Sequence, residues 1–255
     1  QFQLIQQLQV APGGIEPIDL EPISIAAPAI PHADHALPLF DREMCMQIAI
    51  GSIAKVLGPR FAAIDTHPTR VRLPDEPLML VDRILSIDGE PLSMTTGKIV
   101  TEHDVLAGKW YLDNGRIPTC IAVEAGQADL FLSGYLGIDF ETKGLAVYRL
   151  LDAVVTFHDQ LPGIGKTIHY EIELKEFFRQ GDTWLFRFEF EATVDGQPLI
   201  TMKEGCAGFF TQQELDSGKG IVESKMERQI RRGVLPADFR ELAPMKVESL
   251  DGTQV

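Results

Sequence analysis

The sequence predicts an α+β fold in which an antiparallel sheet of about six strands wraps around one long central helix. The first observation is the stretch 116–140, which is apolar on nearly every helical face and therefore needs a surrounding wall. The second is the order of elements, because strand patterns occur both before and after this stretch. The third is the alternation at 168–174, which places the apolar side chains on one face of a strand.

The predicted elements follow one another along the chain. Asp41 is a good N-cap for a leading amphipathic helix, which Gly58-Pro59 ends. Pro118 suits the first turn of the central helix, and Gly137 suits its end. Turn sequences separate the strands, which we expect at 78–87, 92–101, 146–157, 166–177, 183–193 and 198–210.

Two segments flank the predicted domain of residues 40–215. Residues 1–39 contain six prolines among alanine and isoleucine residues, which is typical of an extended linker or arm. Residues 216–255 are polar and charged, which is typical of a solvated linker. We therefore expect a piece of a larger, multidomain protein.

The composition excludes several classes of protein. Of the 255 residues, 45% are hydrophobic and 24% are charged, as in an ordinary globular protein. The formal net charge of −14 argues against nucleic-acid binding, because phosphate binding needs a basic surface. Neither a membrane-spanning stretch nor a signal-peptide pattern is present. The three cysteines have no metal-ligand spacing, so we expect free thiols in the cytoplasm and no metal site.

Glu124 is the residue of the central helix that most needs an explanation. A carboxylate inside a buried helix costs free energy unless it is paired, hydrogen-bonded or functional. One interpretation is a carboxylate at the helix margin that the helix dipole and a hydroxyl partner stabilise. The other is an acid/base group whose pKa is tuned by its surroundings. The residues alone leave both interpretations open.

Three phrases, in the right order, resemble the 3-hydroxyacyl-ACP dehydratase family of bacterial fatty acid synthesis, where ACP is acyl carrier protein. Residues 73–83 are similar to the family's entry strand. Ile117-Pro118, with Glu124 six residues after the proline, is similar to its Met-Pro-Gly motif and helical acid. Residues 157–162 are similar to a strand that ends before a proline turn. More closely, the chain resembles the dehydratase region of bacterial polyunsaturated fatty acid synthases and iterative polyketide synthases, which implies a hot-dog fold.

The resemblance implies a chemistry and a set of site residues. In the family, a histidine removes the α-proton of a 3-hydroxyacyl thioester on ACP, and a helical carboxylate protonates the departing hydroxyl group to leave a 2-enoyl thioester. Glu124 stands at the position of the acid. The amide groups of Thr119 and Cys120 stand where the family polarises the thioester carbonyl, although Thr119 replaces the usual glycine. Gln127 lies one residue before the family's glutamine, and no cofactor is implied.

The family histidine is absent from its expected place, where this chain has Trp110 or a short deletion. His103 and His158 lie close enough to predicted strand ends to approach a site, although a structural role is more common for such histidines. Family sites form between two hot-dogs. We therefore predict that this chain is either half of a composite site, with Glu124 as its acid, or a pseudo-dehydratase. The partner is a second hot-dog of the same polypeptide or of a dimer, and the isolated chain dehydrates nothing.

Two other functions stay open. An acyl thioesterase would use Glu124 to activate water and would need no histidine. A non-catalytic scaffold or acyl-carrier docking module would use the basic segment 225–232. We expect neither a nucleic-acid nor a membrane partner for any of these functions.

Overall fold

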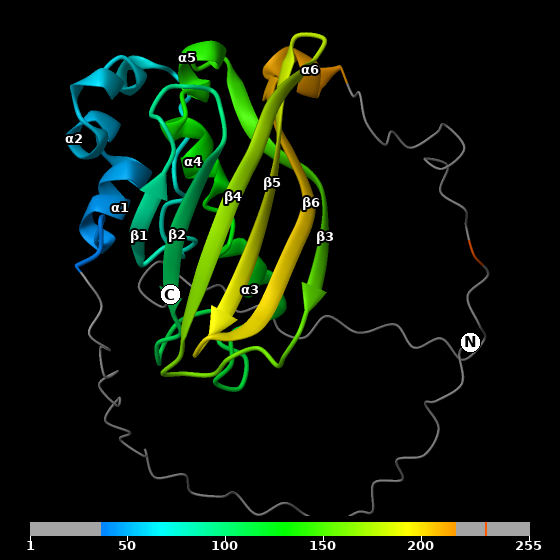
Figure 1. Ribbon diagram of the computed structural model, residues 1–255. Coiled ribbons are helices and arrows are strands. Elements are labelled where there is room, and N and C mark those ends of the chain that lie inside the picture. The colour runs from blue at the N-terminus through cyan, green and yellow to red at the C-terminus, as the bar shows by residue number, and fades with distance from the viewer. Residues whose placement is uncertain (1–36, 218–232, 234–255) are drawn as a thin grey trace, which may run out of the picture. The chain divides into compact units, whose positions relative to one another are not determined.

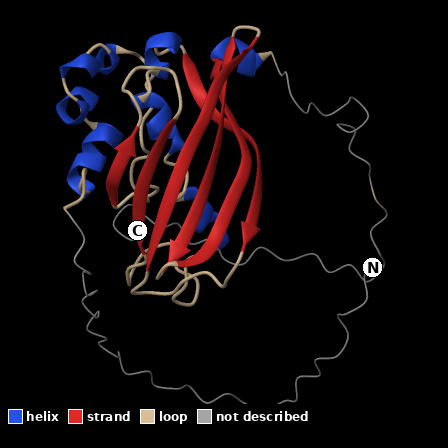
Figure 2. Ribbon diagram, viewed as in Figure 1, coloured by secondary structure: helices blue, strands red, loops and turns tan. Residues whose placement is uncertain are grey.

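The sheet is the frame on which the rest of the chain is arranged. The computed structural model describes residues 37–217 and Gly233, so almost all of the predicted arm 1–39 and linker 216–255 lies outside the described residues. Six strands form one sheet in the order β1-β2-β4-β5-β6-β3 (Figures 1 and 2). Their bounds are β1 Arg83–Asp88, β2 Gly97–Asp104, β3 Ala146–Phe157, β4 Thr167–Gln180, β5 Thr183–Val194 and β6 Gln197–Thr211. This strand order, with helices between β2 and β3, is the predicted hot-dog.

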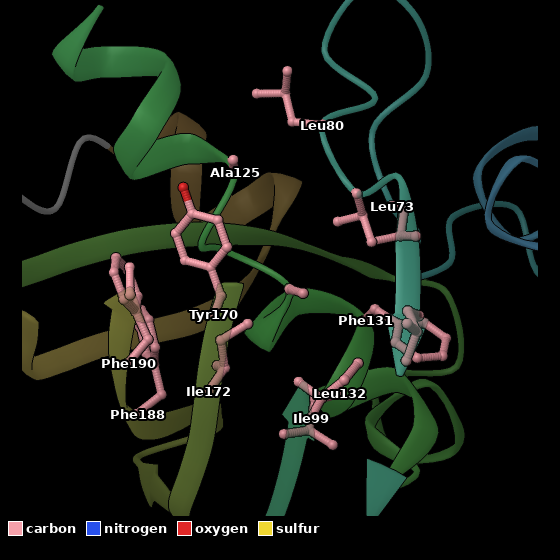
Figure 3. Close-up of a cluster of buried hydrophobic side chains, with 14 of the residues drawn as sticks. Leu73, Leu80, Ile99, Ala125, Phe131, Leu132, Tyr170, Ile172, Phe188 and Phe190 are labelled. Atoms are coloured by element: carbon pink, nitrogen blue, oxygen red, sulfur yellow. The ribbon is translucent and has the colours of Figure 1, made fainter. Parts of the chain in front are cut away.

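The long central strands follow the alternation of the sequence. Ile168, Tyr170, Ile172 and Leu174 of β4 are all buried, as are Phe186, Phe188 and Phe190 of β5. The two strands pair in antiparallel register, with Ile172 opposite Phe190. These side chains form the buried face of the sheet, against which the helical segments pack. Figure 3 shows Tyr170, Ile172, Phe188 and Phe190 grouped on this face. The period of two in the sequence therefore sets which face of the sheet is buried.

The central helix is not one continuous helix as predicted. It divides into α3 Thr119–Glu124, α4 Asp129–Tyr135 and α5 Ile138–Thr142. At the first break, a Cβ atom on Gly126 would lie 2.8 Å from Phe190 Cζ and 2.9 Å from Tyr170 Cδ1, so the backbone passes directly over these two aromatic rings. The second break is at Gly137, the predicted stop, whose φ of 111° suits glycine. The apolar run is therefore continuous in sequence but bent in space.

The elements before the central helices differ from the prediction at their boundaries. Asp41 caps the leading helix as predicted, with its side chain accepting a hydrogen bond from the Met44 amide. That helix is not continuous, however: it divides into α1 Arg42–Ile50 and α2 Ile53–Leu57, and α2 ends at Gly58 as predicted. The first two strands each begin five residues late, at Arg83 instead of 78 and at 97 instead of 92. Part of the connection between these two strands bonds to α4 instead of to a strand, since the amides of Leu92 and Met94 donate to the Tyr135 and Leu136 carbonyls.

The hot-dog ends close to the end of β6. The described residues up to Phe210 form one compact unit, and a second unit begins at Thr211. Within the described part of that second unit, α6 Gln212–Asp216 begins with a capping box between Thr211 and Glu214. No helix in the described ranges has the length and apolar character needed to cross a membrane.

Candidate functional site

A cavity of about 110 Å³ lies beside the junction of α3 and α4. Most of its wall is apolar, and its polar members are Glu124, Gln127 and Tyr148. The apolar wall comes from the extended segment before β1 and from α4, and it consists of Leu73, Pro74, Leu78, Leu80, Val81 and Leu130. Figure 3 shows Leu73 and Leu80 on that extended segment, across from the helical segment that carries Ala125. Glu124 therefore faces a small chamber with few other polar groups.

The Glu124 carboxyl group is half-buried at the last residue of α3. Burial raises its pKa above the ordinary value, because the apolar wall disfavours the charged form. Gln127 Nε2 donates a hydrogen bond to Glu124 Oε2 at 3.3 Å. The two residues are three positions apart, a spacing that brings side chains together within a helical turn. The geometry suits a carboxyl group that holds its proton nearer to neutral pH and releases it to a bound molecule.

A second carboxyl group lies close by and was not among the predicted site residues. Asp129, the first residue of α4, is 0% exposed. The Tyr148 hydroxyl of β3 donates to Asp129 Oδ2 at 2.9 Å, and Oδ1 has no partner among the described residues. Burial and the nearby Glu124 charge raise the pKa of Asp129 to about 7, and the Tyr148 hydrogen bond opposes that rise. One sign of this residue is visible without a structure, since an aspartate interrupts the apolar run.

Two predicted site residues lie apart from the cavity. Thr119 and Cys120 form the first turn of α3, both are exposed, and neither lines the cavity that contains Glu124. Cys120 is a free thiol. The first amide groups of a helix have no partner within the helix, so both amides point out of the start of α3 as hydrogen-bond donors. The structure therefore brings Glu124 and Gln127 together and leaves the other two at the opposite end of the same short helix.

The histidines considered as substitutes do not line the cavity. His103 is buried, with Nε2 at 2.8 Å from the Tyr111 hydroxyl and Nδ1 at 3.1 Å from Asp82. His158 is exposed at the end of β3, where it bonds to Thr201. No histidine of the described part of the chain is in the wall of the Glu124 cavity.

The residue at the expected histidine position has a different contact. Trp110 is exposed, and its Nε1 donates to the Pro77 carbonyl at 3.1 Å. Pro77 immediately precedes Leu78, which is part of the cavity wall. Trp110 thus holds the segment that forms the wall and supplies no base. No group of three or more histidine, cysteine or acidic side chains in the described ranges is placed to hold a metal ion.

Comparison with known proteins agrees with this topology. The family model described as a FabA-like domain matches residues 73–203. The chain is 39% identical, over 208 residues, to a polyunsaturated fatty acid synthase subunit of Thraustochytrium sp.. That match covers 80% of this chain but 14% of the relative, so the chain spans a small part of the relative's length.

Solved structures give a weaker likeness. The dehydratase heterocomplex ApeI:P from Xenorhabdus doucetiae is similar with a TM-score of 0.40 and 17% identity, covering 58% of this chain and 93% of that chain. A mutant thioesterase from Pseudomonas aeruginosa is similar with a TM-score of 0.37 and 12% identity, covering 51% of this chain and 81% of that chain. The family model spans the entry segment, the Glu124 helix and all strands up to β6, and the chain belongs to the FabA-like domain family.

Proposed function

We propose that this chain is the dehydratase-like domain of a polyunsaturated fatty acid or related polyketide synthase, and that it acts on 3-hydroxyacyl chains carried by ACP in the cytoplasm. The observation that carries the proposal is the half-buried Glu124 carboxyl group in an apolar cavity of a FabA-like hot-dog. The identity to the synthase relative supports the setting. No cofactor takes part in the proposed reaction.

The proposed reaction is a β-elimination of water. A base removes the proton from the α-carbon, the bond between the β-carbon and the hydroxyl oxygen breaks, and Glu124 protonates the departing oxygen. The products are a 2-enoyl thioester and water. Glu124 suits this step because its pKa is raised, so a larger fraction of the group carries a proton near neutral pH. We assign Gln127 to orient the carboxyl group, and the amides of Thr119 and Cys120 to polarise the thioester carbonyl.

We further propose that a second hot-dog supplies the base, either from the same polypeptide or from a dimer. The lack of a histidine in the wall of the Glu124 cavity, among the described residues, supports this proposal. So does the position of the cavity, because Tyr148 in its wall belongs to β3, the strand at one edge of the sheet. A partner that extended the sheet beyond β3 would lie beside Glu124.

The test is a turnover assay with 3-hydroxyacyl thioester, using the chain alone, the partner hot-dog alone and the two together. We expect water loss only from the pair, falling by about 10²-fold or more in Glu124→Gln. Glu141→Gln is the matched control, since Glu141 is an exposed glutamate on α5. Turnover by the pair that is insensitive to Glu124→Gln would make this domain a scaffold. Turnover by the isolated chain would show that it needs no partner.

The same assay tests a second function. An acyl thioesterase would use Glu124 to activate water, and a cavity with a glutamate and no described histidine is compatible with that chemistry. Release of free thiol in place of a 2-enoyl product would favour the thioesterase.

A further inference from the structure

Asp129 and Tyr148 form a buried pair directly behind the proposed acid. Tyr148 belongs to the edge strand β3, and its ring packs against Phe186 and Phe209 with centroids 6.2 and 6.1 Å apart. Its hydroxyl group donates to the Asp129 carboxyl group, and the same side chain is part of the Glu124 cavity wall. This hydrogen bond joins β3, which carries Tyr148, to the start of α4 at Asp129, and α3 ends at Glu124 five positions earlier.

We propose that Asp129 and Tyr148 are positioning residues for Glu124, and that their hydrogen bond fixes the bend between α3 and α4 and so presents the Glu124 carboxyl group to its cavity. This inference rests on the proposed role of Glu124 as the acid. It assigns no contact with substrate to either residue. The bend is short, with the hydrogen bonds Gly126 N to Val123 O and Gln127 N to Glu124 O, so its geometry depends on what holds the start of α4.

Charge gives a second, independent reason for the pairing. The titratable groups that face Asp129 within the described residues are Glu124 on α3 and Tyr148 on β3. After burial, which is the largest cause, the charges of Asp129 and Glu124 both raise the pKa of Tyr148. The two carboxyl groups thus share one poorly solvated environment, in which ionisation of either one favours the proton on the other. This coupling indicates that the Asp129 carboxyl group lies close to that of Glu124, whose own pKa is raised by burial.

A structural role alone would stabilise the fold without changing the titration of Glu124 or its geometry in catalysis. The test therefore reads the carboxyl groups directly. The 255-residue chain is labelled with ¹³C at aspartate and glutamate carboxyl carbons and titrated by NMR, with Glu124 and Asp129 assigned by the loss of their signals in Glu124→Gln and Asp129→Asn. The variants are Glu124→Gln and Tyr148→Phe. Tyr135→Phe is the matched control, because it removes a hydroxyl group that bonds to Gly89 O from the same helix, α4.

Two shifts of opposite sign are expected. The pKa of Asp129 falls from about 7 in Glu124→Gln, because the neighbouring negative charge is gone. It rises above that value in Tyr148→Phe, because a donor to the charged form is lost. Tyr135→Phe leaves it unchanged. An Asp129 pKa that does not move in Glu124→Gln, or that does not rise in Tyr148→Phe, overturns the proposal.

Turnover of the pair of hot-dogs provides the second measurement. We expect kcat to fall about tenfold in Tyr148→Phe with KM within about twofold, as for a displaced catalytic group, and no change in Tyr135→Phe. Equal kcat values in the two variants would show that the pair does not position Glu124. If the wild-type pair has no turnover, the proposed function is wrong, and the titration still decides whether Asp129 is coupled to Glu124 and to Tyr148.

Discussion

Glu124 and Asp129 are two carboxyl groups five positions apart, and their surroundings give them different properties. Glu124 is half-buried at a cavity and has an amide donor from Gln127, whereas Asp129 is fully enclosed and has a phenol donor. A third carboxyl group, Asp139, shows a purely structural use, because both of its oxygens accept from the Val71 amide at 3.0 and 3.2 Å. Burial thus raises the pKa of all three, but only Glu124 reaches a space that a ligand can enter.

The pKa of Asp129 predicts a pH dependence of stability at the residue scale. Its pKa is raised from 3.8 to about 7, so the folded state binds the proton more tightly than the unfolded state does. The contribution of Asp129 to the free energy of unfolding should therefore fall as the pH rises between about 4 and 7. Asp129→Asn removes this contribution, so its stability should decline less than that of the wild type over the same range. Urea unfolding at several pH values measures the stability of the wild type and of Asp129→Asn. Asp139, whose pKa is also raised, is present in both proteins and therefore contributes equally to their pH dependence. Parallel curves would contradict the prediction.

At the scale of elements, the bend between α3 and α4 decides what the site contains. A straight helix through 118–136 would point Glu124 and Asp129 in directions set by the helical repeat alone. The bend instead places Gly126 against the rings of Tyr170 and Phe190. Tyr170 also donates from β4 to the Ala122 carbonyl at 2.7 Å, which fixes α3 on the sheet. The site is thus assembled by contacts between the helices and the sheet.

Gly126→Ala tests how closely the bend packs. In an open helical position this change stabilises a protein by roughly 0.5–1 kcal/mol, since it lowers the entropy of the unfolded chain. Here the added methyl group would lie within 3 Å of Phe190 and Tyr170, so we expect a loss of about 1–3 kcal/mol. Urea unfolding of the wild type and of Gly126→Ala measures the sign of the change in the free energy of unfolding. A gain in stability would mean that the backbone at the bend has room that the structure does not show.

At the scale of the whole molecule, β3 is an edge strand of the sheet, and no described segment pairs with its outer side. Both of its faces carry exposed apolar side chains, among them Leu151 at 51% and Val154 at 52%. An apolar edge strand is a template for pairing with another strand. The same strand carries Tyr148, so this edge and the Glu124 cavity are adjacent. These facts support the proposed assembly with a second hot-dog.

Val154→Lys tests this assembly. We expect a charge at the centre of the apolar edge to weaken association with the partner hot-dog at least tenfold, with little change in the stability of the chain. Ile50→Lys on α1 is the control, because Ile50 is exposed to a similar extent, 55%, but lies on another element. Sedimentation velocity of the mixture over a range of concentrations measures the association. Equal weakening by both changes would point to a general charge effect instead of pairing at β3.

Local patterns by themselves determined the hot-dog architecture. The alternation in β4 and β5, the apolar run of the central helices, the Asp41 cap and the stop at Gly137 all depend on residues close in sequence. Glu124 could be singled out for the same reason, since a carboxylate in an apolar run is visible without a structure.

Tertiary contacts decided the rest. At the helix bend, aromatic rings from β4 and β5, distant in sequence, leave no space for a Cβ atom at Gly126. The second strand begins late, at Gly97, because the amides of Leu92 and Met94 bond to carbonyls at the end of α4. Asp129 meets Tyr148 across 19 positions, and His103 is held by Asp82 and Tyr111 away from the cavity. Each of these contacts depends on how the helices lie on the sheet, which no periodicity in the sequence encodes.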